Sequence, residues 1–155
     1  MSLSVWRIAW NGALDLQTLA NGSLLADGRW HVASLRLPIV YCGSSRALCQ
    51  LEKRVHCNGF APRDMALLRL KLPANCDLEH AQNLGLLPTW RFDEAHTRNL
   101  GAAWAMAGKS IGLWVPSYIE PAECNLLLNP RHPQFASIEV TIEQNPFHFD
   151  PRLFE

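Results

Sequence analysis

The order of hydrophobic and polar residues along the chain predicts several short strands. Residues 65–72 alternate in their second half, which is typical of a strand with one exposed face. A first strand is predicted at 5–9 and another at 39–41, after a loop-rich stretch punctuated by Asn-Gly and Asp-Gly pairs. Three later strand-like runs are separated by prolines, which break any continuous helix: 111–115, 124–128 and 138–142.

Two segments carry the spacing of helices. The first is predicted to begin at Ser44 or Ser45 as its cap and to run to about Cys57, where Asn58-Gly59 ends it. The second is predicted over 94–107, because its apolar residues recur every three to four positions and Gly108 supplies a stop. The chain, 1–155, is therefore predicted to be a single compact α+β domain with a mixed β core and two main helices.

Composition limits which ligands the protein binds and where in the cell it is expected. The chain has 155 residues, 48% of them hydrophobic, and its 14 Lys and Arg residues balance 14 Asp and Glu. Because there is no net positive charge to hold a polyanion, direct binding of nucleic acid is not expected. The start of the chain lacks the pattern of a signal peptide, and no apolar stretch reaches the roughly 18 residues that span a bilayer. We expect a cytoplasmic protein that does not bind membranes.

The five cysteines are an odd number and show no Cys-x-x-Cys spacing. This pattern favours neither a disulfide framework nor a closed zinc site, so we expect reduced, mostly buried thiols. A catalytic cysteine paired with one of the six histidines remains an alternative, but no local signature supports it.

Glu52 is the most unusual residue of the first helix. On a helical wheel Leu48, Leu51 and Val55 form the apolar stripe, and Glu52 falls beside it as the one charged residue on the inward half. A carboxylate there forms a structural ion pair, lies at the rim of the core, or belongs to a functional site.

Two arginines also stand in unusual places. Arg29 follows Gly28, where a flexible backbone lets a guanidinium bind phosphate oxygens, although it can equally be a surface arginine that stacks on Trp30. Arg7 lies among apolar residues in the first predicted strand, and a buried arginine usually needs an anion.

Three polar residues at strand ends have a structural and a functional interpretation. Tyr41 is either a core tyrosine with a satisfied hydroxyl or a surface on which a ligand stacks, and Ser117 either caps a turn or binds a ligand. Asn125 lies at the start of an apolar run that ends at 129–133, a predicted turn. His132 in that turn has no second ligand at metal spacing, so no metal site is expected.

The sequence has no GxGxxG, P-loop, HExxH or GxSxG element, so the common nucleotide-binding, zinc-protease and hydrolase classes lose their main support. Composition and spacing alone leave an unassigned α+β domain.

In order along the chain, these segments resemble the RES domain. The more specific block is Leu-Trp-Val-Pro-Ser at 113–117 followed by Asn-Leu-Leu-Leu-Asn-Pro-Arg-His-Pro at 125–133. The earlier block is Trp-Arg-Ile at 6–8, Gly-Arg-Trp at 28–30, Pro-Ile-Val-Tyr at 38–41, 47–52 and Val-His at 55–56. The family is named for an arginine, a glutamate and a serine, which map to Arg29, Glu52 and Ser117.

The resemblance implies a toxin of a bacterial toxin–antitoxin pair, with a core like that of ADP-ribosyltransferases and an Xre-type antitoxin as partner. It implies that NAD⁺ is a substrate that the toxin degrades, with no cofactor and no metal. Glu52 would stabilise the positive charge that builds on the ribose, and Arg29 with Arg7 would bind the diphosphate. Tyr41 would pack on nicotinamide or ribose, Ser117 would hydrogen-bond the nicotinamide side, and Asn125 would help to bind the substrate.

The acceptor of the ADP-ribosyl group stays open among water, phosphate and a protein side chain. Two other functions also stay open, a protein ADP-ribosyltransferase and a non-catalytic module that binds an Xre-type antitoxin. The sequence departs from the family at His31, where many relatives carry Asn nearby, and 58–97 shows little that can be matched.

Overall fold

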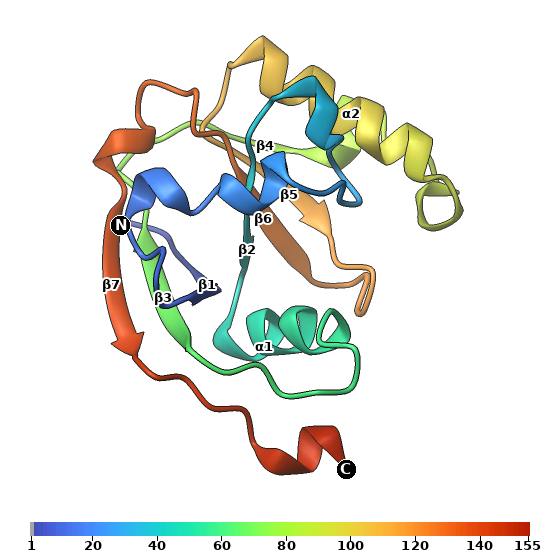
Figure 1. The fold of residues 1–155 in the computed structure, drawn as a ribbon. Helices are drawn as coiled ribbons and strands as arrows, with labels where there is room; N and C mark the ends of the chain where they lie inside the picture. Colours follow the sequence, from blue (N-terminus) through green and yellow to red (C-terminus); the bar gives the residue numbers. More distant parts are fainter. Residues whose placement is uncertain (1) are drawn as a thin grey trace.

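A computed structural model describes residues 2–155, which form one seven-stranded mixed sheet with two α-helices and several 3₁₀ helices (Figure 1). The strand order is β4-β5-β6-β2-β1-β3-β7, and only β4 and β5 pair in parallel. The strands are β1 (Ser4–Trp10), β2 (Val40–Gly43), β3 (Met65–Lys71), β4 (Leu78–His80), β5 (Gly112–Pro116), β6 (Cys124–Leu128) and β7 (Glu139–Gln144). The helices are α1 (Arg46–Val55) and α2 (Glu94–Ala107). The predicted α+β class with a mixed sheet and two main helices is confirmed.

The sheet has two halves joined by a short contact. β1 pairs with β3 over seven register positions but with β2 at one, Trp6 opposite Gly43. The strands β7, β3 and β1 therefore form one half, and β2, β6, β5 and β4 form the other. Backbone groups of β2 beyond that single pair are free to bind side chains instead of β1.

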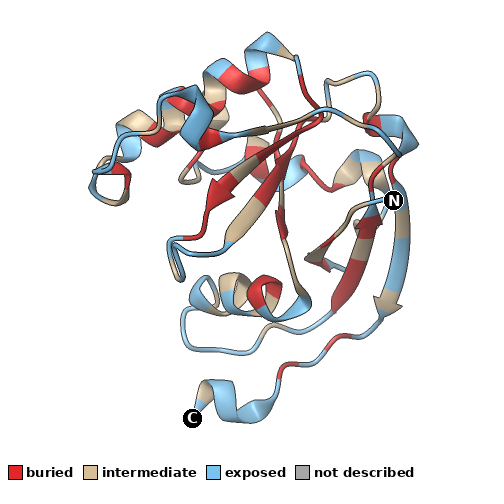
Figure 2. Ribbon diagram, turned by 180° about the vertical axis from the view of Figure 1, so that it is seen from behind, coloured by how far each residue is buried: buried red, intermediate tan, exposed pale blue. Residues whose placement is uncertain are grey.

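Each half of the sheet is covered by different elements. Trp30, Leu100 and Trp104 pack on the β5–β6 half, so α2 and the loop before β2 form one layer there. Phe147 and Phe149 pack on β1 and β3, so the tail after β7 lies on the body through its aromatic residues. Figure 2 shows buried residues concentrated in the strands, while the outer faces of both helices are exposed.

The first helix differs from its prediction in length and in orientation. It begins after Ser45, whose side chain accepts from the Leu48 N–H, and it ends at Val55 rather than near 57. Its buried residues are Leu48 and Cys49, whereas Leu51 is 41% exposed and Val55 is 58% exposed. The predicted stripe of Leu48, Leu51 and Val55 is therefore wrong, because the sheet contacts the helix on the side of Cys49.

The other differences lie at sheet edges and among the thiols. The edge strand β4 was not predicted because it has three residues, and β7 begins and ends later than the predicted 138–142. All five cysteines are free, and Cys42 and Cys49 are buried while the other three are partly exposed, so burial was overpredicted. Within residues 2–155 no helix is long and apolar enough to cross a membrane.

Candidate active site

Glu52 lies at the centre of the inward face of α1. At about 100° per residue, it falls between Leu48 and Cys49, the two buried residues of the helix. Its Oε1 accepts one hydrogen bond from the Ser117 hydroxyl and one from the Asn125 side-chain amide, each at 2.7 Å. Its Oε2 accepts no hydrogen bond from any residue within 2–155. One carboxylate oxygen is thus held by two neutral donors, and the other is left for a ligand.

Three neighbouring strands bring these residues together. Asn125 on β6 lies opposite Gly43, the last residue of β2, and opposite Val115 on β5. Because α1 starts directly after β2 and Ser117 follows the end of β5, Glu52, Ser117 and Asn125 meet at the same end of the sheet.

Ser117 caps a turn, as one of its two interpretations had it, and also binds Glu52. It is fully buried, and its hydroxyl oxygen accepts from the backbone N–H groups of Ile119 and Glu120 at 3.1 and 3.2 Å. The same hydroxyl donates a hydrogen bond to Glu52. The turn after β5 therefore fixes the serine, and the serine fixes the carboxylate.

Arg7 reaches across the gap between the two halves of the sheet. Its Nη1 donates to the Tyr41 carbonyl oxygen at 2.9 Å, which is one of the groups of β2 that β1 leaves unpaired. Its Nε is buried and has no hydrogen-bond partner within the described chain. Binding of an anion by this donor stays a prediction.

The Tyr41 hydroxyl holds the loop that carries Arg29. It accepts from the Trp30 backbone N–H at 3.3 Å and lies 2.6 Å from Nδ1 of His31. The other ring nitrogen of His31 lies 2.8 Å from the Ala26 carbonyl oxygen, which can only accept, so Nδ1 is the acceptor and Tyr41 donates to it. Burial raises the pKa of Tyr41, which keeps this hydroxyl protonated. The hydroxyl is satisfied internally, and stacking of its ring on a ligand stays a prediction.

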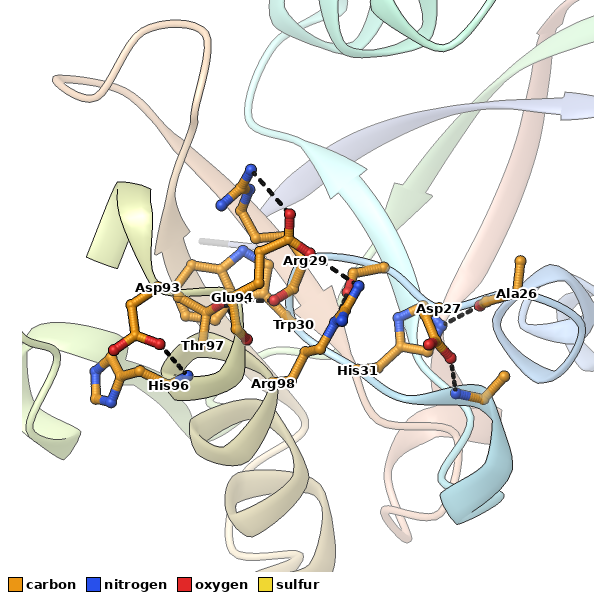
Figure 3. Close-up of polar contacts among 12 residues, drawn as sticks. Ala26, Asp27, Arg29, Trp30, His31, Asp93, Glu94, His96, Thr97 and Arg98 are labelled. Atoms are coloured by element: carbon orange, nitrogen blue, oxygen red, sulfur yellow. Dashed lines mark hydrogen bonds and ion pairs between the residues drawn. The ribbon is translucent and has the colours of Figure 1, made fainter. Parts of the chain in front are cut away.

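The loop at 28–31 lies against α2 (Figure 3), and two glycines mark where the backbone or side chains approach too closely for a Cβ. A Cβ on Gly28 would lie 2.7 Å from the Tyr41 hydroxyl oxygen, and one on Gly101 of α2 would lie 1.9 Å from the Trp30 carbonyl oxygen. Arg98 of α2 donates from Nε to the Gly28 carbonyl oxygen at 2.9 Å and pairs with Glu94 at 2.8 Å. The glycine before Arg29 is therefore required for packing.

Arg29 stacks on Tyr118. One alternative from the sequence, stacking on Trp30, is therefore wrong. Its Cζ lies 4.2 Å from the centroid of the Tyr118 ring, and its Nη2 lies 4.0 Å from Glu94. Its Nη1 is buried without a hydrogen-bond partner inside residues 2–155. Arg29 therefore contacts the residue that directly follows Ser117, the partner of Glu52.

The structure links all six predicted site residues. Glu52 contacts Ser117 and Asn125, Arg29 contacts the residue after Ser117, Tyr41 binds the residue after Arg29, and Arg7 binds Tyr41. Sequence reasoning missed two residues of this cluster, Tyr118 and Arg91, whose Cζ lies 4.4 Å from the same ring. The one sequence feature that could have drawn attention to Arg91 is its position between two aromatic residues, Trp90 and Phe92.

Other candidate features have structural explanations. Asn129 is fully buried, binds the Ala105 carbonyl oxygen and accepts from the Arg131 N–H, so the 129–133 segment is the predicted turn. Nδ1 of His132 accepts from the backbone of that turn. A hollow of about 370 Å³ lies between α2 and the β4 edge of the sheet, and its lining includes Glu79, Trp104 and Lys109 but none of the predicted site residues. No group of three His, Cys, Asp or Glu residues suited to a metal occurs in the part of the chain that the structure describes.

Comparisons with known proteins agree on one family. The RES domain family model matches residues 4–150. "Toxin Res" of Pseudomonas putida is 38% identical over 154 residues, covering 97% of this chain and 99% of that protein. "Prs ADP-ribosylating toxin" of Sphingobium sp. is 33% identical over 162 residues, covering 99% and 98%. The crystal structure of the M. tuberculosis MbcT–MbcA toxin–antitoxin complex contains a chain of similar fold, with a TM-score of 0.67 at 17% identity, covering 99% of this chain and 87% of that one.

Proposed function

This chain belongs to the RES domain family, and from that premise we propose that it is the toxin of a toxin–antitoxin pair and degrades NAD⁺. The reaction is cleavage of the bond between nicotinamide and ribose. The names of the relatives from P. putida and Sphingobium support a toxin, and the second name supports chemistry on an ADP-ribosyl group.

The observation that carries the proposal is the state of Glu52. Two neutral donors hold its Oε1 at 2.7 Å, and no cation within 2–155 pairs with it, so its negative charge stays available to a substrate. The residue after Ser117, Tyr118, contacts two arginines, Arg29 and Arg91, through its ring. A molecule with a developing cation at one end and phosphates at the other fits this separation of charge.

The chemistry follows from the charges. As the C1′–N bond breaks, its electron pair moves to the nicotinamide nitrogen, which becomes neutral, and positive charge builds on the ribose as in glycoside hydrolysis. The free Oε2 of Glu52 stabilises that oxocarbenium-like state. An acceptor then bonds to C1′ and, if it is water, releases a proton to solvent. Ser117 and Asn125 act as positioning residues, because they hold the carboxylate in one orientation.

The remaining residues hold the substrate. The orphaned donors of Arg29 and Arg7 bind oxygens of the diphosphate. Tyr41 offers its ring to nicotinamide or ribose, while its hydroxyl keeps the Arg29 loop in place. No metal enters this scheme, because Glu52 and the arginines supply the charges that the reaction needs.

Transfer of ADP-ribose to a protein is the second candidate. The name of the Sphingobium relative, an ADP-ribosylating toxin, favours it. The same carboxylate and arginines serve that reaction, and the difference lies only in the acceptor at C1′. A non-catalytic binding module is disfavoured, because such a module has no need of a half-buried carboxylate that is held by two fixed donors and pairs with no cation.

An antitoxin is the proposed partner. The solved neighbour is a toxin bound to its antitoxin, and the equal numbers of acidic and basic residues here suit a toxin that leaves DNA binding to an Xre-type partner. The antitoxin would cover the Glu52 end of the sheet and thereby exclude NAD⁺.

The test is release of nicotinamide from NAD⁺ by the purified chain, with Glu52→Gln as the matched variant. Glu52→Gln keeps the shape of the side chain and an acceptor for Ser117 and Asn125 but removes the charge. We expect release by the native chain and almost none by the variant. Free ADP-ribose identifies water as the acceptor, ADP-ribose 1″-phosphate identifies phosphate, and labelled protein identifies transfer. No release under any of these conditions would contradict the proposal.

A further inference from the structure

Arg91 is a second guanidinium at the Tyr118 ring, and neither a sequence motif nor the mechanism above uses it. It lies in the short 3₁₀ helix Trp90–Phe92, just before α2, far along the chain from the loop after β5. Its Nη2 donates to the Tyr118 carbonyl oxygen at 2.8 Å, and its Cζ lies 4.4 Å from the ring centroid. Arg29 contacts the same ring at 4.2 Å. Two like charges are thus brought to one aromatic side chain.

Both arginines keep a buried donor without an acceptor. Nη1 of Arg29 and Nε of Arg91 are buried and form no hydrogen bond within residues 2–155. Buried donors are nearly always satisfied in folded proteins, so two orphaned donors on adjacent cations indicate a missing anionic acceptor.

The local carboxylate does not supply that acceptor. Glu94 lies 2.8 Å from Arg98 but 4.0 Å from Arg29, so its charge is mainly shared with Arg98. In the described part of the chain no carboxylate lies within ion-pair distance of Arg91. Figure 3 shows Arg29 and Arg98 reaching Glu94 from separate elements. The cluster therefore holds three guanidinium groups and one carboxylate, an excess of positive charge.

From these contacts we infer that Arg91 is an anion-binding residue, which together with Arg29 binds a phosphate group on the Tyr118 side of the site. The planar guanidinium of arginine matches the oxygens of phosphate, and the ring of Tyr118 holds both guanidinium groups in place. The inference rests on the proposed function for the identity of the substrate, which carries two phosphates.

The position of the cluster indicates which end of the substrate it meets. Ser117 donates to Glu52, and the next residue, Tyr118, contacts the two arginines. The cationic nicotinamide riboside therefore lies toward Glu52, and the negative phosphates lie toward Arg29 and Arg91. The phosphate is either part of the dinucleotide or a free inorganic phosphate that acts as acceptor, and the same chemistry binds both.

The experiment is equilibrium binding, measured in the full chain carrying Glu52→Gln so that no turnover occurs. NAD⁺, nicotinamide riboside, pyrophosphate and inorganic phosphate are the probes, and Arg91→Ala is the variant. Arg63→Ala removes the same charge from an exposed position and is the matched control. If Arg91→Ala does not fold, Arg91→Gln keeps a donor for the Tyr118 carbonyl and carries the test.

We expect the Arg91 variant to weaken NAD⁺ and pyrophosphate binding about tenfold to a hundredfold, the effect of losing a charge-assisted hydrogen bond. Binding of nicotinamide riboside should not change, and the Arg63 variant should behave like the parent. Loss of inorganic phosphate binding alone would identify the acceptor site.

Two results would overturn the inference. One is unchanged affinity for every phosphate-bearing probe, including the case in which the parent binds none. The other is an equal loss of nicotinamide riboside binding, which marks a general disturbance of the site. Pyrophosphate contains no nicotinamide, so a variant that loses pyrophosphate binding supports the anion site even if the chain degrades no NAD⁺. The failures of the two proposals are therefore distinguishable.

Discussion

Two carboxylates near α1 are held in opposite ways. Glu143 on β7 accepts from both Nε and Nη2 of Arg46, at 2.9 and 2.6 Å, and from the Trp6 indole N–H at 3.0 Å. Glu52 accepts only from the neutral donors Ser117 and Asn125, both on one oxygen. The Arg46 side chain holds the pKa of Glu143 below its usual range.

The difference distinguishes a carboxylate with a structural partner from the one that we propose to be functional. A guanidinium neutralises Glu143 and ties β7 to the start of α1, so no charge is left for a ligand. Glu52 is oriented as firmly but keeps its charge. The arginines show the same contrast, because Arg46 pairs with Glu143 through Nε and Nη2 whereas Arg29 and Arg91 keep buried donors without a partner. The pattern of partners, more than burial, distinguishes the residues that we propose to bind the substrate.

The largest expected effect is that of replacing the Glu52 carboxylate by an amide, compared with the same replacement at Glu143. Glu52→Gln should lower the rate of NAD⁺ cleavage on the order of 10²- to 10³-fold, because a charge opposite the developing cation is lost. Glu143→Gln, the matched change, should leave the rate within about twofold. Equal losses in nicotinamide release by the two variants would erase the contrast between the two carboxylates.

A smaller effect is expected from moving the Arg29 loop. In Gly101→Ala the new Cβ would lie 1.9 Å from the Trp30 carbonyl oxygen, so α2 must shift away from the loop. We expect a loss of about 1–3 kcal/mol in the free energy of unfolding, measured with urea, and a raised KM for NAD⁺. At Gly22 a Cβ meets no atom within 4 Å, so Gly22→Ala should change neither quantity. Tolerance of Gly101→Ala would show that the contact is not needed.

The hydroxyl of Tyr41 should matter for stability. Tyr41→Phe leaves the Trp30 N–H and His31 Nδ1 without partners, and both residues are buried. The free energy of unfolding should fall by about 1–3 kcal/mol. Tyr118→Phe is the control, since the Tyr118 hydroxyl forms no hydrogen bond within 2–155. Equal unfolding midpoints for the two variants would mean that the loop is held by other contacts.

The smallest effect concerns two buried thiols, Cys42 of β2 and Cys49 of α1. Burial raises the pKa of Cys42 to about 12 and of Cys49 to about 11, above the ordinary value of 9.0. Because the folded pKa values are raised, the stabilisation is complete below pH 9 and is lost as the pH rises from 9 toward 11 and 12. Each thiol should lower the free energy of unfolding by about 1 kcal/mol between pH 9 and pH 10.

Urea titrations at pH 7.5, 9 and 10 measure this loss. It should be the same in Glu52→Gln and Glu143→Gln, because it depends on neither carboxylate. It should be weaker in a variant that carries both Cys42→Ala and Cys49→Ala. An unchanged dependence on pH in that variant would assign the alkaline loss to other groups.

The sequence predicted most of the fold where a local pattern was strong. The alternation in β3, the serine cap of α1 and the Gly108 stop of α2 are features of consecutive residues, and each is confirmed. β4 escaped because its three residues at a sheet edge have no period to detect. The orientation of α1 was wrong, since the packing of Cys49 is decided by the sheet and not by the hydrophobicity of the helix alone.

The site was only partly predictable for a related reason. A charge among apolar neighbours identified Glu52 and Arg7, and motifs identified Arg29, Tyr41, Ser117 and Asn125. Contacts between distant segments leave no such mark. The stacking of Arg29 and Arg91 on Tyr118 joins three separate parts of the chain, so the sequence suggested only Trp30 as a stacking partner of Arg29 and gave Arg91 no role.

The most direct test of the central claim is the NAD⁺ concentration in bacterial cells after induced expression of this chain alone. Cells that express Glu52→Gln at the same soluble level are the comparison. The account predicts that NAD⁺ falls and growth stops with the native chain, while both stay normal with the variant. NAD⁺ that is unchanged by the native chain, or that falls equally with both, would contradict the role of Glu52 in NAD⁺ degradation.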